Sequence, residues 1–106
     1  MSRRVIGKRP AWLNPDNSYD LLLPFDYAVG DQQQKLARLQ LKRLTGVELL
    51  ILDQSFGFAE KLLQLIESQT GLLRVITSRI DAVDLDRIDD IFGYFREPGS
   101  VTGATS

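Results

Sequence analysis

Residues 35–50 read KLARLQLKRLTGVELL, and the fold is decided within this stretch. In its first half, apolar and polar side chains alternate, with Ala37, Leu39 and Leu41 on one face and Arg38, Gln40 and Lys42 on the other. A period of two is typical of a strand with one buried face. From Thr45 onward the sequence TGVE fits a capping box, in which Thr45 accepts the amide of Glu48 and the Glu48 carboxylate reaches back. We therefore expect a strand to end near Arg43 and a short helix to run from Thr45 to about Asp53.

The preceding segment predicts the partner strand. Its alternating apolar residues are Tyr19, Leu21, Leu23 and Phe25. Pro24 has no amide hydrogen, so it places this strand at a sheet edge or bends it. Gly30 lies within an expected turn at residues 29–32, because glycine adopts positive φ without strain. Residues 19–43 therefore predict an antiparallel β-hairpin with one apolar and one solvated face.

The apolar residues after the hairpin follow a helical period. Residues 58–70 predict a helix that stops at Gly71, and residues 72–80 predict a shorter one. Asp84 is expected to cap a further helix. The apolar stripe of that helix is Leu85, Ile88, Ile91, Phe92 and Phe95. The apolar face of the hairpin and the apolar sides of the helices must each be buried, and packing them together buries both. The expected fold class is therefore α+β, an N-terminal antiparallel β-hairpin covered by three to four short C-terminal helices.

The chain of 106 residues is long enough for one domain, which we expect over residues 19–96. Residues 1–18 are expected as a flexible basic leader, whose end packs against the domain through Trp12 and Leu13. The basic residues of this leader are Arg3, Arg4, Lys8 and Arg9. An alternative is that the leader contacts an acidic partner or nucleic acid. Residues 97–106 are expected as a disordered tail.

Two residue types are missing, and their absence excludes several kinds of chemistry. Without cysteine the chain has no disulfide, thiol nucleophile or zinc–thiolate site, and without histidine it has no imidazole base or ligand. With 13 basic and 14 acidic side chains the net charge is −1, which argues against a globally basic nucleic-acid binder. No run of 18 apolar residues is present, so we expect no membrane span and a cytoplasmic location.

The strongest charge cluster lies near the C-terminal helix. Its members are Asp81, Asp84, Asp86, Asp89 and Asp90. Their spacing does not match an EF-hand loop, which needs alternating ligands, a central glycine and a closing glutamate. Helix capping and solvation are therefore the preferred interpretation, and a carboxylate-based, metal-dependent enzyme is an alternative. The sequence predicts no catalytic, cofactor-binding or metal-binding residue and no enzymatic activity.

Three aromatic residues are candidates for binding a partner protein. Phe56 and Phe58 flank Gly57 between two expected helices, and Tyr94 falls off the apolar stripe of the last helix. A competing interpretation takes residues 58–80 as a helix-turn-helix and the protein as a small DNA-binding regulator that also uses the basic leader. The second of these helices offers few basic side chains to a DNA groove, so this interpretation is the alternative.

The order of several short motifs resembles a known family. The motifs are LLLPF at residues 21–25, the turn at Gly30, LQLKR at residues 39–43, TGVELL at residues 45–50, QTG at residues 69–71, and an aspartate-led helix finishing at Phe95. Together they resemble the small tail assembly chaperones of Mu-like and P2-like contractile-tailed phages and prophages. The resemblance covers roughly residues 19–96. The sequence departs from the family in its basic leader and at Leu44, where the family often has proline.

The resemblance implies a non-enzymatic assembly factor that needs no cofactor. Such chaperones bind the tape measure protein, help to recruit tail-tube subunits, act in the bacterial host cytoplasm and are absent from the mature virion. The resemblance leaves self-association open, as well as a longer product made by ribosomal frameshifting. It implies no membrane partner, and binding to nucleic acid is not expected.

The predicted lack of metal dependence can be tested directly. Thermal melts in calcium, magnesium or manganese should show no shift beyond the effect of ionic strength, because the sequence lacks a recognised ligand spacing. A large, saturable rise in melting temperature that Asp84→Asn or Asp86→Asn removes would instead favour the metal-dependent enzyme.

Overall fold

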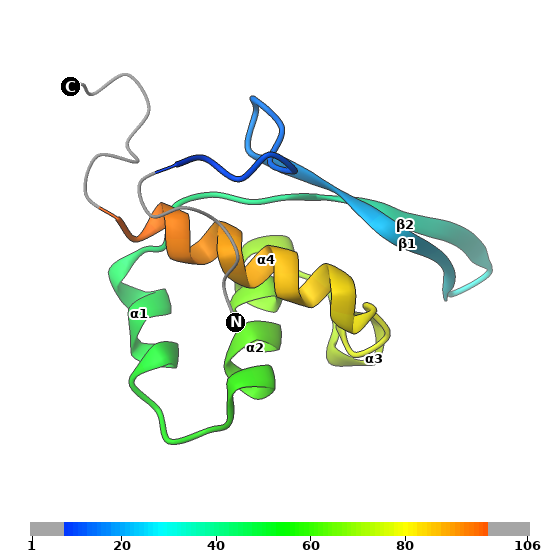
Figure 1. The fold of residues 1–106 in the computed structure, drawn as a ribbon. Coiled ribbons are helices and arrows are strands. Elements are labelled where there is room, and N and C mark those ends of the chain that lie inside the picture. The colour runs from blue at the N-terminus through cyan, green and yellow to red at the C-terminus, as the bar shows by residue number, and fades with distance from the viewer. Residues whose placement is uncertain (1–7, 98–106) are drawn as a thin grey trace.

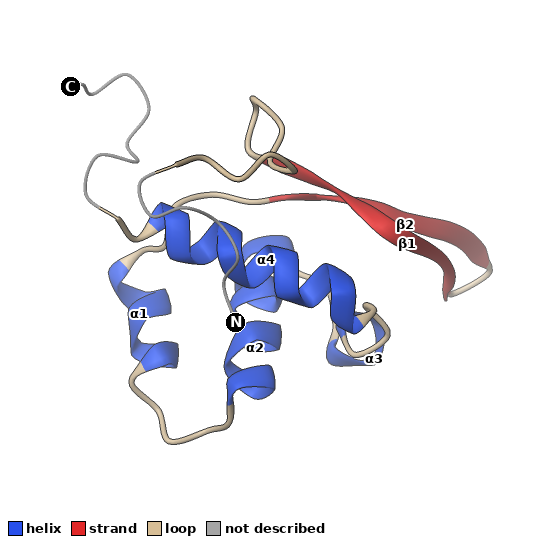
Figure 2. Cartoon of the chain, viewed as in Figure 1, coloured by secondary structure: helices blue, strands red, loops and turns tan. Residues whose placement is uncertain are grey.

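A two-stranded hairpin and four helices form the chain, of which the computed structural model describes residues 8–97. In chain order the elements are β1 (Ser18–Val29), β2 (Gln32–Gln40), α1 (Gly46–Leu52), α2 (Phe58–Thr70), α3 (Arg74–Thr77) and α4 (Ala82–Phe95). The strands are antiparallel, and the far end of the hairpin extends beyond the helices (Figure 1, Figure 2). The expected α+β class is confirmed.

The hairpin contains a wide bulge near Pro24. Asp20 pairs with Arg38 and Phe25 pairs with Leu36, so residues 21–24 of β1 lie opposite a single residue of β2. The break expected at Pro24 is therefore confirmed, since proline cannot donate to the ladder.

The bulge also changes which side chains face the core. Leu23 is half-exposed, although strict alternation places it beside Phe25, and Leu36 is buried although alternation places it on the solvated face. The expectation for Leu23 was wrong because it lies inside the bulge, where the alternation is interrupted. Beyond the bulge, the changed register pairs Leu36 with Phe25, so Leu36 also faces the core.

Asp84 holds the bulge in place. Its carboxylate accepts the amide of Leu22 at 2.8 Å and the amide of Leu23 at 3.1 Å, and the Tyr19 hydroxyl donates to it as well. Asp84 is fully buried, and the cap of α4 is instead Asp81, which accepts the amide of Val83 at 2.9 Å. The expectation that Asp84 caps this helix was wrong, because its three donors come from β1 rather than from its own helix.

Tyr19 is suited to this role because it stays protonated. Burial raises the pKa of the Tyr19 hydroxyl far above its usual range, and the hydrogen bond to Asp84 raises it further. The hydroxyl therefore remains a donor at any ordinary pH.

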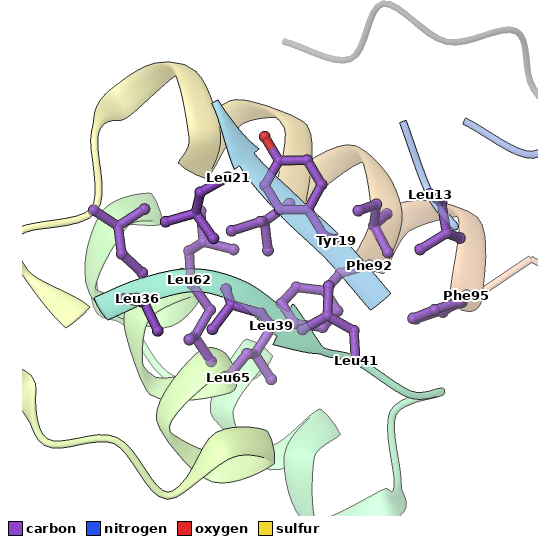
Figure 3. Close-up of a cluster of buried hydrophobic side chains, with 14 of the residues drawn as sticks. Leu13, Tyr19, Leu21, Leu36, Leu39, Leu41, Leu62, Leu65, Phe92 and Phe95 are labelled. Carbon is purple, nitrogen blue, oxygen red and sulfur yellow. The ribbon is translucent and has the colours of Figure 1, made fainter. Parts of the chain in front are cut away.

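The core lies between the hairpin and the helices (Figure 3). The strands and their flanks contribute Leu13, Tyr19, Leu21, Leu36, Leu39 and Leu41. The helices and the turn before α4 contribute Leu62, Leu65, Ile66, Ile76, Ile80, Ile88, Ile91, Phe92 and Phe95. Of the stripe expected on α4, only Leu85 is half-buried rather than buried.

Polar side chains join the short helices α1 and α2. The predicted capping box is present, with the amide of Thr45 donating to Glu48 at 3.0 Å and the amide of Glu48 donating to the Thr45 hydroxyl at 3.4 Å. Glu48 is buried, and its carboxylate also accepts the Ser68 hydroxyl at 2.8 Å. At the far end of α2, Gly71 has a φ of 77°, which confirms the predicted stop.

The helix expected over residues 72–80 is only the single turn α3, so this prediction was wrong in length. Thr70 accepts the amide of Leu72 through its hydroxyl at 3.2 Å, and Leu73 is extended, so the chain cannot start a helix before Arg74. The amide of Ile80 bonds to the carbonyl of the residue three positions earlier, which is turn geometry rather than α-helix.

The end of the expected leader packs against the domain. Pro10 and Leu13 are buried, and the Trp12 indole donates to the carbonyl of Arg87 at 3.2 Å. The contact predicted for Trp12 and Leu13 is therefore confirmed, and packing against the domain begins near residue 10, within the expected leader. Residues 1–7 and 98–106, which hold the rest of the expected leader and nearly all of the expected tail, lie outside the described residues.

We predict that Asp84→Ala lowers the free energy of unfolding by about 3 kcal/mol or more, because it leaves the buried Tyr19 hydroxyl and the amides of Leu22 and Leu23 without their acceptor. Asp81→Ala, which removes only the cap of the same helix, should cost about 1 kcal/mol. Urea denaturation of both variants measures the difference. Equal losses would show that the Asp84 carboxylate does not fix the bulge.

Candidate partner-binding surface

Phe56 and Phe58 lie at the connection between α1 and α2, farthest from α4 (Figure 1). Phe56 follows α1, and Phe58 is the first residue of α2. Their side chains are 47% and 59% exposed. The structure therefore leaves both aromatic candidates accessible to a partner.

Helix α1, which leads into this connection, also exposes apolar side chains along its length. Val47 is 73% exposed and Leu50 is 61% exposed, and residues three apart share one side of a helix. Helices α1 and α2 pack against each other. We call the exposed residues Val47, Leu50, Phe56 and Phe58 the α1–α2 surface.

Tyr94 does not belong to this surface. It lies on α4, at the other end of α1 and α2 from their connection (Figure 1). Its ring is half-buried, 6.0 Å from the Phe95 ring and 6.0 Å from the guanidinium of Arg9. The three predicted aromatic candidates are thus divided between two places.

The structure contains a cleft that sequence reasoning missed. A cavity of about 200 Å³ is lined by Leu44, Leu52, Leu65, Asp89, Asp90, Phe92, Gly93 and Arg96. It adjoins a groove of about 320 Å³ that shares Leu44 and Arg96 and adds Arg43, Leu49 and Phe95. We call the two together the α1–α4 cleft. Its walls come from separate segments of the chain, so no local pattern in the sequence indicated it.

Charge is unevenly distributed along the cleft. Asp89 and Asp90 lie in the cavity, Arg43 lies in the adjoining groove, and Arg96 lines both. Burial raises the pKa of the Asp89 carboxyl above its usual range, and the charges of Asp90 and Asp86 add to the shift. The cleft therefore combines apolar residues with both carboxylates and guanidinium groups, and the charge of Arg96 partly offsets the rise in the Asp89 pKa.

Four of the five aspartates of the expected charge cluster are divided among three places. Asp81 caps α4, Asp84 binds β1, and Asp89 and Asp90 line the cleft. Within residues 8–97, no group of three or more aspartate or glutamate side chains could hold a metal ion.

The helix-turn-helix of the competing interpretation is not formed over residues 58–80. Its second helix is the single turn α3, and Arg74 at its start pairs with carboxylates. The Arg74 guanidinium donates twice to Glu60, each at 2.8 Å, and also binds Glu67, which accepts the Thr77 hydroxyl at 2.6 Å. This network joins α2 to α3. It also holds the Arg74 guanidinium, which a recognition helix would need for contact with DNA.

No family model, curated protein or solved structure matches this chain. Among the helices that the structure describes, none combines the length and the apolar character needed to cross a lipid bilayer.

We predict that the Glu67 network stabilises the protein in a pH-dependent way. Burial alone would raise the pKa of Glu67, but hydrogen bonds from Arg74 and Thr77 outweigh it and hold the pKa below the usual 4.5. The stabilisation is thus complete above the unfolded pKa and is lost as pH falls through the lower folded value. Glu67→Gln should lower the free energy of unfolding by about 1 kcal/mol at pH 7, and the difference from the wild type should shrink below about pH 4.5.

Denaturation curves at pH 7 and pH 3 measure this difference. Asp26→Asn is a matched control, since it removes an exposed ion pair with Lys35 and should change stability little at either pH. A Glu67→Gln loss that is equally large at both pH values would contradict the electrostatic explanation.

Proposed function

We propose that this chain is a non-enzymatic tail assembly chaperone of a contractile-tailed phage or prophage, acting in the bacterial cytoplasm on the tape measure protein and assisting tail-tube assembly. The observation that carries the proposal is the α1–α2 surface, where apolar side chains remain exposed on a well-packed domain. The resemblance over residues 19–96 supplies the family.

The α1–α2 surface has the composition of a protein-binding site. Aromatic side chains are enriched among the residues that dominate binding energy, and Phe56 and Phe58 are aromatic and about half exposed. Exposed apolar residues on a helix pair suit the recognition of an amphipathic helix. A tape measure protein is long and helical, so it offers such segments throughout its length.

The charges of the described residues favour a protein partner over DNA. Arg9 donates to Asn17, Arg38 pairs with Asp20, and Arg87 stacks on Trp12. Arg74 is held by Glu60 and Glu67. With so many guanidinium groups already engaged and a net charge of −1, the DNA-binding regulator is the second candidate.

We predict that the double variant Phe56→Ala and Phe58→Ala fails to keep a co-expressed tape measure fragment soluble yet retains a cooperative melt. Removing exposed aromatic anchors typically costs about 2 kcal/mol or more of binding, whereas exposed side chains contribute little to folding. The measurements are the soluble fraction of the fragment and the thermal melt of the variant.

Leu73→Ala with Val75→Ala is the matched control, because these side chains are 67% and 69% exposed but lie at α3. This control should solubilise the fragment as the wild type does. A control that fails equally would show that general surface apolarity matters, not the α1–α2 surface. A wild type that leaves the fragment insoluble but shifts a DNA duplex at physiological salt would favour the regulator instead.

A further inference from the structure

The outer half of the hairpin has two open edges. It consists of residues 25–29 and 32–36, and it extends beyond the helices (Figure 1). Among residues 8–97, the strands pair only with each other, apart from the bridge between Leu13 and Tyr19 at the inner end of β1. An exposed edge offers unpaired backbone groups to any strand that can add to the sheet.

The inner half of each edge is covered by side chains. On β1, Asp84 accepts the amides of Leu22 and Leu23. Just beyond β2, the Gln69 side chain accepts the amide of Lys42 at 3.0 Å and donates to its carbonyl at 2.8 Å, as a neighbouring strand would. The outer half of β1 carries neither a proline nor a bulge, two of the devices that protect a sheet edge.

The turn determines which backbone groups point outward from β1. Gly30, with a φ of 61°, and Asp31 form a two-residue turn, and such a turn is closed by a hydrogen-bonded pair. Hydrogen-bonded and non-hydrogen-bonded pairs alternate along an antiparallel ladder. Asp26 and Ala28 therefore belong to pairs of the second kind, and their amides and carbonyls point away from β2.

We propose that the outer edge of β1 pairs with the same edge of a second copy of this chain, antiparallel and centred on Tyr27, to form one continuous sheet from the two hairpins. In this register Asp26 of one chain lies opposite Ala28 of the other. The outward amides and carbonyls of both residues then find partners across a two-fold axis. This inference goes beyond the proposed function and does not depend on it.

The charges of the strand select this register. A register centred on Asp26 would place like charges directly opposite each other, which is destabilising. Centred on Tyr27, each Asp26 instead faces an alanine and keeps its own ion pair with Lys35 at 3.4 Å. The junction between the two chains therefore carries no uncompensated charge.

The side chains favour β1 over β2 as the joining edge. Phe25, Tyr27 and Val29 share one face of β1. In the proposed register Tyr27 lies beside its own counterpart, and Phe25 lies opposite Val29. Aromatic and β-branched side chains form the cross-strand pairs that stabilise sheets. The residues of β2 that pair with Tyr27 and Val29 are Gln34 and Gln32, which offer no such pairs.

Hydrogen exchange tests the proposal without any substitution. Because only residues 25–29 of each chain meet, we expect a weak dimer with a dissociation constant of about 100 µM or tighter. Raising the protein concentration from about 5 µM to about 500 µM should slow exchange of the Asp26 and Ala28 amides about threefold or more. The amides of Gln33 and Lys35, which point outward from β2, should exchange equally fast at both concentrations.

Ala28→Pro is the matched variant, and Gln33→Pro is its control. The two residues pair across the hairpin, and each substitution removes one outward amide without removing a hydrogen bond between β1 and β2. Sedimentation at about 500 µM should show mostly dimer for the wild type and for Gln33→Pro, but monomer for Ala28→Pro. All three proteins should keep a cooperative melt.

A wild type that stays monomeric at this concentration would overturn the proposal, as would an Ala28→Pro variant that still forms the dimer. A dimer in which Asp26 and Ala28 gain no protection would also overturn it, because the chains would then meet elsewhere, such as at the α1–α2 surface. Loss of association in Gln33→Pro as well would show that β1 pairs with β2 of the next copy. That arrangement is open-ended, and the two-fold dimer would be wrong.

Discussion

The buried carboxylate of Asp84 is the interaction on which the fold depends. Within the bulge of β1, the amides of Leu22 and Leu23 turn away from the strand pairing, and unpaired amides inside a protein are costly. One side chain from α4 satisfies both and also accepts the Tyr19 hydroxyl. Hairpin and helix are thereby fixed to each other by directional bonds as well as by apolar contact.

Carboxylates also join the short helices to one another. Glu48 joins α1 to α2, and Glu67 joins α2 to α3, each through a carboxylate that accepts several donors. Helices of four to thirteen residues are too short to be stable alone, so they depend on such tertiary contacts. Polar side chains therefore determine how the elements are arranged around an otherwise ordinary apolar core.

The features that could be predicted from the sequence are those that depend on residues close together in the chain. The Thr45–Glu48 capping box, the stop at Gly71 and the break at Pro24 each depend on neighbouring residues, and all were found. The role of Asp84 was missed because its partners lie 61 to 65 residues earlier, and a position near a helix start resembles a cap. The cleft was missed for the same reason, while the exposure of Phe56 and Phe58 followed from their place in a short connection.

The separation between Tyr19 and Asp84 has a consequence for synthesis of the protein. The hairpin emerges from the ribosome first, but the acceptor that fixes its bulge lies 65 residues later. During translation the bulge amides must remain bonded to water until α4 has left the exit tunnel. Contacts this distant in sequence also slow folding, because a long loop must close before they form. The nascent chain therefore completes its core only after α4 has emerged.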